Sequence, residues 1–258
     1  MARKRKYIKT GICIWCGKKE PEVTFKNKPH IVPDAVGGNQ LSFDVCDECN
    51  RSFGSQPNCN IPSPDQIFCE IFNLQRFCGG DYIKNGEKHR TNYIKLKDNI
   101  LQIPIVPIFS DTVGTQLKRA FYEIFLQKYH AFTEDGNNPK FNPIVSFARY
   151  NANVCDLKVY YVKEQMWFVP CIQEKTFIPM SKKMIQEMND SGFFNFNFLG
   201  YNFFIEVFKE KCNKSRDSYF RSQLSKLTIP GRCITEFNNI SQLDEIFKYL
   251  NVEKIEYI

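Results

Sequence analysis

Two Cys-x-x-C pairs near the start of the chain constrain its fold more than any other feature. Cys13 and Cys16 form the first pair, and Cys46 and Cys49 form the second. Four thiolates at this spacing can reach one tetrahedral Zn²⁺, because each tight turn supplies two ligands. The sequence therefore predicts a structural zinc site that pins residues 13–54 into one small folded unit.

The composition indicates a globular protein in a reducing compartment. The chain has 258 residues, of which 43% are hydrophobic and 24 are phenylalanine, so it can bury a core and is not a disordered chain. It begins with charged residues instead of the apolar stretch of a secretory signal, and it lacks a membrane-spanning run of about 18 apolar residues. Under reducing conditions Cys-x-x-C pairs bind metal far more often than they form disulfides, so we expect a cytoplasmic protein with no membrane partner.

The positive charge is concentrated at the N-terminal end. Up to Gly54 the chain carries ten Lys or Arg against six Asp or Glu, which is four of the seven net positive charges. A basic end attached to a metal site suggests a polyanionic partner, most simply nucleic acid. The alternative is that residues 3–6 are only a solvated tail.

The local patterns predict an α+β protein. In the first 54 residues we expect short strands at 7–12 and 41–45, extended segments at 23–25 and 28–32, and a helix from Asp47 to Gly54. Further on, helices are predicted over 63–77, 112–132 and 241–250, the second with an apolar stripe. Strands are predicted at 93–96, 100–105, 157–162, 166–172, 193–199 and 201–207. We expect a small domain at residues 1–58 and a larger α+β domain at 59–258.

Two polar side chains sit where the zinc would fix their positions. His30 lies on the predicted extended segment between the cysteine pairs, and Asn50 follows Cys49 directly. A neutral imidazole with a pKa near 6.5 can remove a proton from water, and an ion held by Asn50 can contact a phosphate, which suits phosphodiester hydrolysis. Alternatively, His30 is a structural histidine and Asn50 a helix cap. His89 and His130 are interpreted as structural or surface residues.

At these residues the sequence resembles the HNH, or ββα-metal, endonucleases with a four-cysteine structural zinc. The resemblance rests on His-Ile-Val-Pro from His30 to Pro33, on Gly37-Gly38-Asn39, and on Cys-Asp-Glu-Cys-Asn-Arg-Ser-Phe-Gly from Cys46 to Gly54. It covers about 45 residues, and the order of its motifs is specific. It implies His30 as the general base, Asn50 as a ligand of a catalytic Mg²⁺ or Mn²⁺, and Asn39 as a residue that shapes the loop and orients His30.

One position departs from the family pattern. Many members carry Asp, Glu or His directly before the general base as a second ligand of the catalytic ion, and here Pro29 occupies that position. Asp34, four residues after His30, and Asp44 are the candidate substitutes. With Asn50 as the sole protein ligand, the ion would bind weakly.

Two functions follow as hypotheses. The first is a metal-dependent DNA endonuclease, with RNA open as a substrate, whose larger domain serves targeting, regulation or oligomerisation. By analogy such a protein acts in phage defence or restriction, either as a homo-oligomer or with a partner protein of a defence system. The second hypothesis is a non-catalytic zinc-stabilised nucleic-acid-binding protein with a degenerate site at Pro29.

Overall fold

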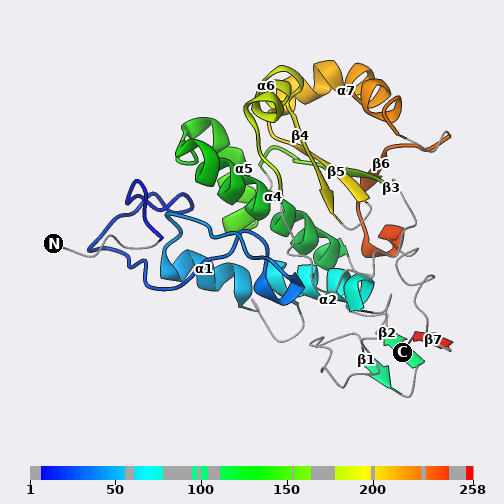
Figure 1. Ribbon diagram of the computed structural model, residues 1–258, viewed down its shortest axis with the longest axis horizontal. Coiled ribbons are helices and arrows are strands. Elements are labelled where there is room, and N and C mark those ends of the chain that lie inside the picture. The colour runs from blue at the N-terminus through cyan, green and yellow to red at the C-terminus, as the bar shows by residue number, and fades with distance from the viewer. Residues whose placement is uncertain are drawn as a thin grey trace.

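A computed structural model describes residues 7–55, 61–77, 95–97, 100–103, 111–152, 154–163, 178–198, 201–227, 231–243 and 254–257. Helices and an antiparallel sheet occur in the same chain, so the predicted α+β class is confirmed (Figure 1). In the described part of the chain, no helix is long and apolar enough to cross a membrane.

The N-terminal part is mostly loops and short helices. It contains the 3-10 helix η1 (Asp34–Val36) and α1 (Asp47–Gly54), followed by α2 (Pro64–Phe77). The start of α2 is a capping box, because the Ser63 N–H donates to Gln66 Oε1 at 2.9 Å and the Gln66 N–H donates to Ser63 Oγ at 3.3 Å. The helices predicted over 47–54 and 63–77 are confirmed.

The strands predicted at 7–12 and 41–45 are wrong. These residues form only isolated bridges, Ile12 with Lys19 and His30 with Leu41, and residues 23–25 form no strand. The backbone explains the difference, because Gly11 has φ +79° and Asp44 has φ +54°. A left-handed residue turns the chain out of the extended conformation, so neither strand can continue.

The helix α4 (Asp111–Thr133) runs through the centre of the molecule (Figure 1). The predicted apolar stripe along it is confirmed, since Leu117, Phe121 and Phe125 have no exposed surface. Its polar side is buried as well, including Glu123 and His130. The 3-10 helix η3 (Pro139–Phe141), α5 (Asn142–Tyr150) and α2 pack around α4, so α4 is covered on several sides.

A four-stranded antiparallel sheet covers α4. Its order is β4 (Phe193–Phe198), β5 (Tyr201–Glu206), β3 (Val159–Lys163) and β6 (Thr235–Phe237), with Phe194 opposite Ile205. Strands predicted at 157–162, 193–199 and 201–207 are confirmed as β3, β4 and β5. Side chains alternate as a period of two requires, so Phe194 belongs to the α4 side and Phe193 to the opposite side.

The helix α7 (Lys209–Leu224) lies over the outer face of this sheet, and α6 (Lys182–Ser191) contacts both β4 and α7 (Figure 1). A separate three-stranded sheet has the order β1 (Lys95–Lys97), β2 (Ile100–Ile103) and β7 (Lys254–Tyr257). The first two match the predicted strands at 93–96 and 100–105. The strand predicted at 166–172 lies outside the described residues. Of the helix predicted over 241–250, only 241–243 is described, as the end of the 3-10 helix η4 (Ile240–Leu243).

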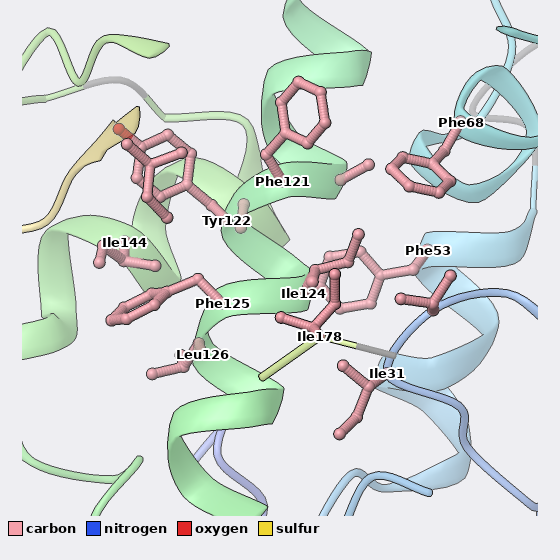
Figure 2. Packing of buried hydrophobic residues seen from close by; sticks show 14 of the residues in the cluster. Ile31, Phe53, Phe68, Phe121, Tyr122, Ile124, Phe125, Leu126, Ile144 and Ile178 are labelled. Atoms are coloured by element: carbon pink, nitrogen blue, oxygen red, sulfur yellow. The ribbon is translucent and has the colours of Figure 1, made fainter. Parts of the chain in front are cut away.

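The hydrophobic core is continuous from the cysteine-containing segment to the sheet. Phe53 extends from α1 towards α4, where Ile124 lies, and Ile31 and Ile178 lie beside them (Figure 2). Ile31 directly follows His30, so the packing of this side chain fixes the backbone next to the predicted base. The division into domains 1–58 and 59–258 stays a prediction.

Candidate metal centre and active site

The four predicted zinc ligands come together in one cluster. The sulfur atoms of Cys13, Cys16, Cys46 and Cys49 all lie within 4.8 Å of one another, and Cys16 Sγ lies 3.8 Å from Cys46 Sγ. A tetrahedral zinc with four Zn–S bonds of about 2.3 Å places its sulfurs about 3.8 Å apart. The donor set and its spacing therefore fit a zinc ion.

Protonation of the cluster also favours a bound cation. Hydrogen bonding from Cys49 lowers the pKa of Cys13 to about 5, whereas burial raises the pKa of Cys46 to about 12. Four thiolates in so small a volume need a positive charge to balance them. A metal ion held by the four sulfurs would supply that charge and displace the remaining thiol protons, so its affinity would fall at low pH.

Backbone and side-chain donors orient the sulfurs. The Cys46 N–H donates to Cys13 Sγ at 3.4 Å, and the Cys49 N–H donates to Cys46 Sγ at 3.5 Å. Cys46 is thereby both a member of the cysteine cluster and the N-cap of α1. From α5, Arg149 Nε donates to Cys49 Sγ at 3.4 Å. The sequence pattern did not point to Arg149, because it lies 100 residues from the cysteine it contacts.

A buried network around Asp44 holds the first Cys-x-x-C turn beside the second. The carboxylate of Asp44 accepts hydrogen bonds from the N–H groups of Lys9, Thr10 and Gly11 at 2.8–3.0 Å and from the Thr10 hydroxyl at 2.9 Å. His130 Nε2 lies 2.8 Å from the same carboxylate, and both side chains are fully buried. Asp44 is therefore fully engaged in structural contacts, and its interpretation as a ligand of a catalytic ion is wrong.

The tautomer of His130 follows from its two neighbours. The Gly136 N–H donates to His130 Nδ1 at 3.0 Å, so Nε2 carries the proton that is donated to Asp44. Burial opposes the charge on Asp44, but the hydrogen bond from His130 and those from the backbone hold its pKa well below the usual range. The interpretation of His130 as a structural residue is confirmed, and it ties the end of α4 to the cysteine-containing segment.

His30 lies on a short hairpin between the two cysteine pairs. The Ile31 N–H donates to the Gln40 carbonyl and the Ser42 N–H donates to the Pro29 carbonyl, both at 3.0 Å, on either side of the bridge between His30 and Leu41. This ladder is short, but it sets the register of the hairpin. Residues 28–32 are predicted to be extended, and this single bridge is the only strand-like pairing that the structure forms there.

The Gly-Gly pair closes the hairpin for a steric reason. Gly37 has φ +82° and caps η1, while a Cβ on Gly38 would lie 1.9 Å from the Val32 carbonyl oxygen. Gly37 thus supplies a left-handed turn and Gly38 a close backbone contact that other residues cannot make. The loop that follows His30 therefore depends on both glycines.

The surroundings of His30 favour its neutral form. Partial burial and the nearby charge of Lys28 lower the pKa of the imidazole, and Asp34 opposes the shift. The pKa therefore lies below the ordinary value of about 6.5. At neutral pH most His30 side chains carry a free nitrogen lone pair, as a general base requires.

The other predicted site residues surround this hairpin and α1. Asn50 lies within α1, half-buried, and its N–H donates to the Cys46 carbonyl at 2.9 Å, so it is not a helix cap. Asp34 and Asn39 lie on the hairpin loop and are exposed, whereas Pro29 is buried. The convergence of His30, Asn50, Asn39 and Asp34 on a phosphate stays a prediction.

Comparison with known proteins bears on this segment. Residues 13–58 match the family model described as HNH endonuclease. Searches of curated proteins and of solved structures returned no match. The matched residues include all four clustered cysteines, and the family indicates nuclease activity with a nucleic acid substrate. Over residues 13–58 the chain is therefore similar to the HNH endonucleases, and its cysteine cluster fits a zinc ion.

Proposed function

We propose that the protein is a metal-dependent DNA endonuclease in which His30 is the general base. One observation carries the proposal: the four-sulfur cluster joins the two ends of a segment that places His30 on a hairpin and Asn50 on the following helix. The HNH match covers the same segment. A base and an ion-binding group fixed on a braced frame are what phosphodiester hydrolysis requires.

The roles of the residues follow from their environments. An imidazole nitrogen of His30 accepts a proton from the attacking water, since the lowered pKa leaves that nitrogen free at neutral pH. Packing of Ile31 and the glycine turn at Gly37 keep the hairpin backbone in place. Asn39, exposed in the same loop, shapes the loop and orients His30.

Asn50 and Asp34 are the residues that would hold Mg²⁺ or Mn²⁺. Amide and carboxylate oxygens are the donors these ions prefer, and the exposed Asp34 and half-buried Asn50 are both accessible to solvent. The ion, when bound, supplies positive charge that stabilises the phosphoryl group and the leaving 3′ oxygen.

The biological setting is proposed by analogy only. HNH nucleases joined to larger domains suggest restriction or phage defence in the cytoplasm, with DNA as the substrate. Residues 59–258 would then serve target choice, regulation or oligomerisation.

A plasmid-nicking assay tests the proposal. Supercoiled DNA is incubated with wild type and with His30→Ala in Mg²⁺ or Mn²⁺, and His30→Ala is expected to lose at least about 100-fold in rate, because a general base contributes this much. Zinc content should be unchanged, since His30 is not a ligand of the cluster. Asn27→Ala, at an exposed position before the hairpin, is the matched control and should cleave normally. Wild-type cleavage rates in His30→Ala would refute the role of His30.

A second candidate is a nucleic-acid-binding protein without catalysis. The observation that favours it is the poor supply of ligands for a catalytic ion, because Pro29 is buried and Asp44 is engaged with His130. In that case wild type would bind DNA but leave the plasmid intact with every divalent ion tested.

A further inference from the structure

A cavity of about 420 Å³ lies where the C-terminal ends of α1 and α5 meet the N-terminal ends of α2 and α4, and its lining residue Arg149 also contacts Cys49 of the cysteine cluster. Carbon atoms make up most of its lining surface, but most of the described residues that form it carry a polar group, and they include two arginines and no carboxylate. The side chains that matter to the argument are Ser52, Ser55, Thr112, Arg119, Arg149 and Tyr150. A cationic cavity with hydroxyl groups suits an anion such as a phosphate.

The first arginine is fixed in place before any ligand binds. Arg119 is 7% exposed, and its Nε donates to the Ala148 carbonyl at 2.9 Å, while Nη1 donates to Gln116 Oε1. Burial lowers the pKa of Arg119 to about 10, so the guanidinium still carries its charge at pH 7. A positive charge held rigidly near a cavity loses little entropy on binding an anion.

The second arginine is part of an aromatic platform. The Arg149 guanidinium lies 5.1 Å from the ring centroid of Tyr150, and 55% of Tyr150 is exposed, an unusually large fraction for an aromatic residue. Arg149 also lies 3.6 Å from the carboxylate of Glu48, which is 72% exposed and screened by water. An exposed ring beside a cation is the arrangement on which unpaired nucleic acid bases stack.

We propose that this cavity binds one unpaired nucleotide of the nucleic acid substrate, with its phosphate at Arg119 and Arg149 and its base against Tyr150. The inference rests on the proposed function and adds a preference for unpaired strands to it. A base inside a duplex is stacked on both faces and cannot reach a protein ring. The cavity residue Ser52 lies only two residues after Asn50 on α1, so the cavity and the proposed cleavage site are close in the structure although the two side chains leave the helix on different sides.

The test measures binding without cleavage. Fluorescence anisotropy is recorded in the His30→Ala background without divalent ions, with a labelled 12-nucleotide single strand and its duplex as probes. Thr112→Glu places a carboxylate in the cavity at a helix N-terminus that tolerates it, and Tyr150→Ala removes the ring. Each is expected to weaken single-strand binding about tenfold. Asn142→Glu adds the same charge at the exposed N-terminus of α5, outside the cavity, and should change affinity less than twofold.

One further variant, Tyr150→Phe, separates the outcomes. Tyr150→Phe should bind like wild type, because it keeps the ring and loses only a hydroxyl 3.5 Å from the Trp15 carbonyl. Any of three results would overturn the inference. These are equal weakening by Asn142→Glu, unchanged binding by Thr112→Glu and Tyr150→Ala, and an affinity for the duplex equal to that for the single strand. Because no cleavage is measured, a failure of His30 as a base would leave this result standing.

Discussion

The segment at residues 7–55 and the part of the chain around α4 are folded by different interactions. The segment has one eight-residue helix, one 3-10 turn and isolated bridges, held by four sulfurs and the Asp44 network. Around α4, aromatic residues pack directly on one another, as where the rings of Phe121 and Phe203 lie 4.4 Å apart. The first part depends mainly on polar contacts and on the cysteine cluster, and the second on apolar burial.

This difference explains how the hairpin that carries His30 can be held in place with so little regular structure. A segment of about 50 residues buries too little apolar surface to be stable alone, so a metal or other cross-link must contribute. The Phe-rich core around α4 supplies the rest through Ile31 and Phe53. The predictions below test whether the two parts can be damaged separately.

The largest effect is expected from Cys46→Ser. Loss of one thiolate should release the zinc and unfold residues 7–55, because structural zinc sites of this kind couple roughly 10 kcal/mol or more of metal binding to folding. Hydrogen exchange followed by mass spectrometry should show fast exchange in this segment and continued protection in α4 and β5. Cys212→Ser, a buried cysteine outside the cluster, is the control and should keep its zinc.

A smaller loss of stability is expected from Phe121→Ala, and it should affect the core around α4 instead of residues 7–55. Phe121 is fully buried and its ring contacts those of Phe68, Phe196 and Phe203. Its truncation leaves a cavity and should lower the free energy of unfolding by about 4 kcal/mol, measured by urea denaturation. Zinc content should stay the same. Zinc loss in this variant would show that the two parts are one cooperative unit.

Asp44→Asn should destabilise the segment by about 3 kcal/mol at pH 7, since it removes the buried charge that five hydrogen bonds surround. The pKa of Asp44 is lowered on folding, so its stabilisation is complete above about pH 4 and is lost as the pH falls. The difference between wild type and variant in urea denaturation should therefore shrink in acid. The exposed Asp34→Asn should show no comparable loss, and a constant difference at all pH values would contradict this account.

At acidic pH the smallest effect is expected from Glu123→Gln, because an amide resembles the protonated carboxyl group in shape. Burial raises the pKa of Glu123 well above its usual value, and neighbouring Asp65 adds to the shift. Above about pH 4.5 the folded protein thus keeps a proton that the unfolded chain has lost, and stability falls as the pH rises, by up to about 1 kcal/mol per pH unit. In the variant, the free energy of unfolding should differ less between pH 5.5 and pH 8.5 than it does in wild type, as measured by denaturation curves at the two pH values. A slope equal to that of wild type would exclude Glu123 as its source.

The elements that could be predicted from the sequence are those whose own residues carry a clear helix or strand pattern. The helix α4 has an apolar stripe, α2 has a capping box at Ser63, and β4 alternates aromatic and polar residues. By contrast, α7 was not predicted, because few of its residues are apolar and only Cys212 and Gln223 are buried. Its Tyr219 stacks on Phe193 of the sheet, a contact that its own sequence does not reveal.

The parts of the candidate site that could be predicted are those in which chemistry fixes the spacing of residues along the chain. The cysteine cluster follows from two Cys-x-x-C pairs, and the Gly37-Gly38 turn from the need for a left-handed residue and a close backbone contact. The contacts of Asp44 with His130 and of Cys49 with Arg149 span 86 and 100 residues. Such pairings depend on how α4 and α5 pack, which no local pattern encodes.

Elemental analysis of the purified wild-type protein tests the central claim most directly. After dialysis against metal-free buffer, we expect one zinc ion per chain, because four cysteine sulfurs within 4.8 Å of one another bind it tightly. The absence of bound zinc, with residues 7–55 still protected from hydrogen exchange, would contradict the account. The hairpin that carries His30 would then owe its position to something other than a metal.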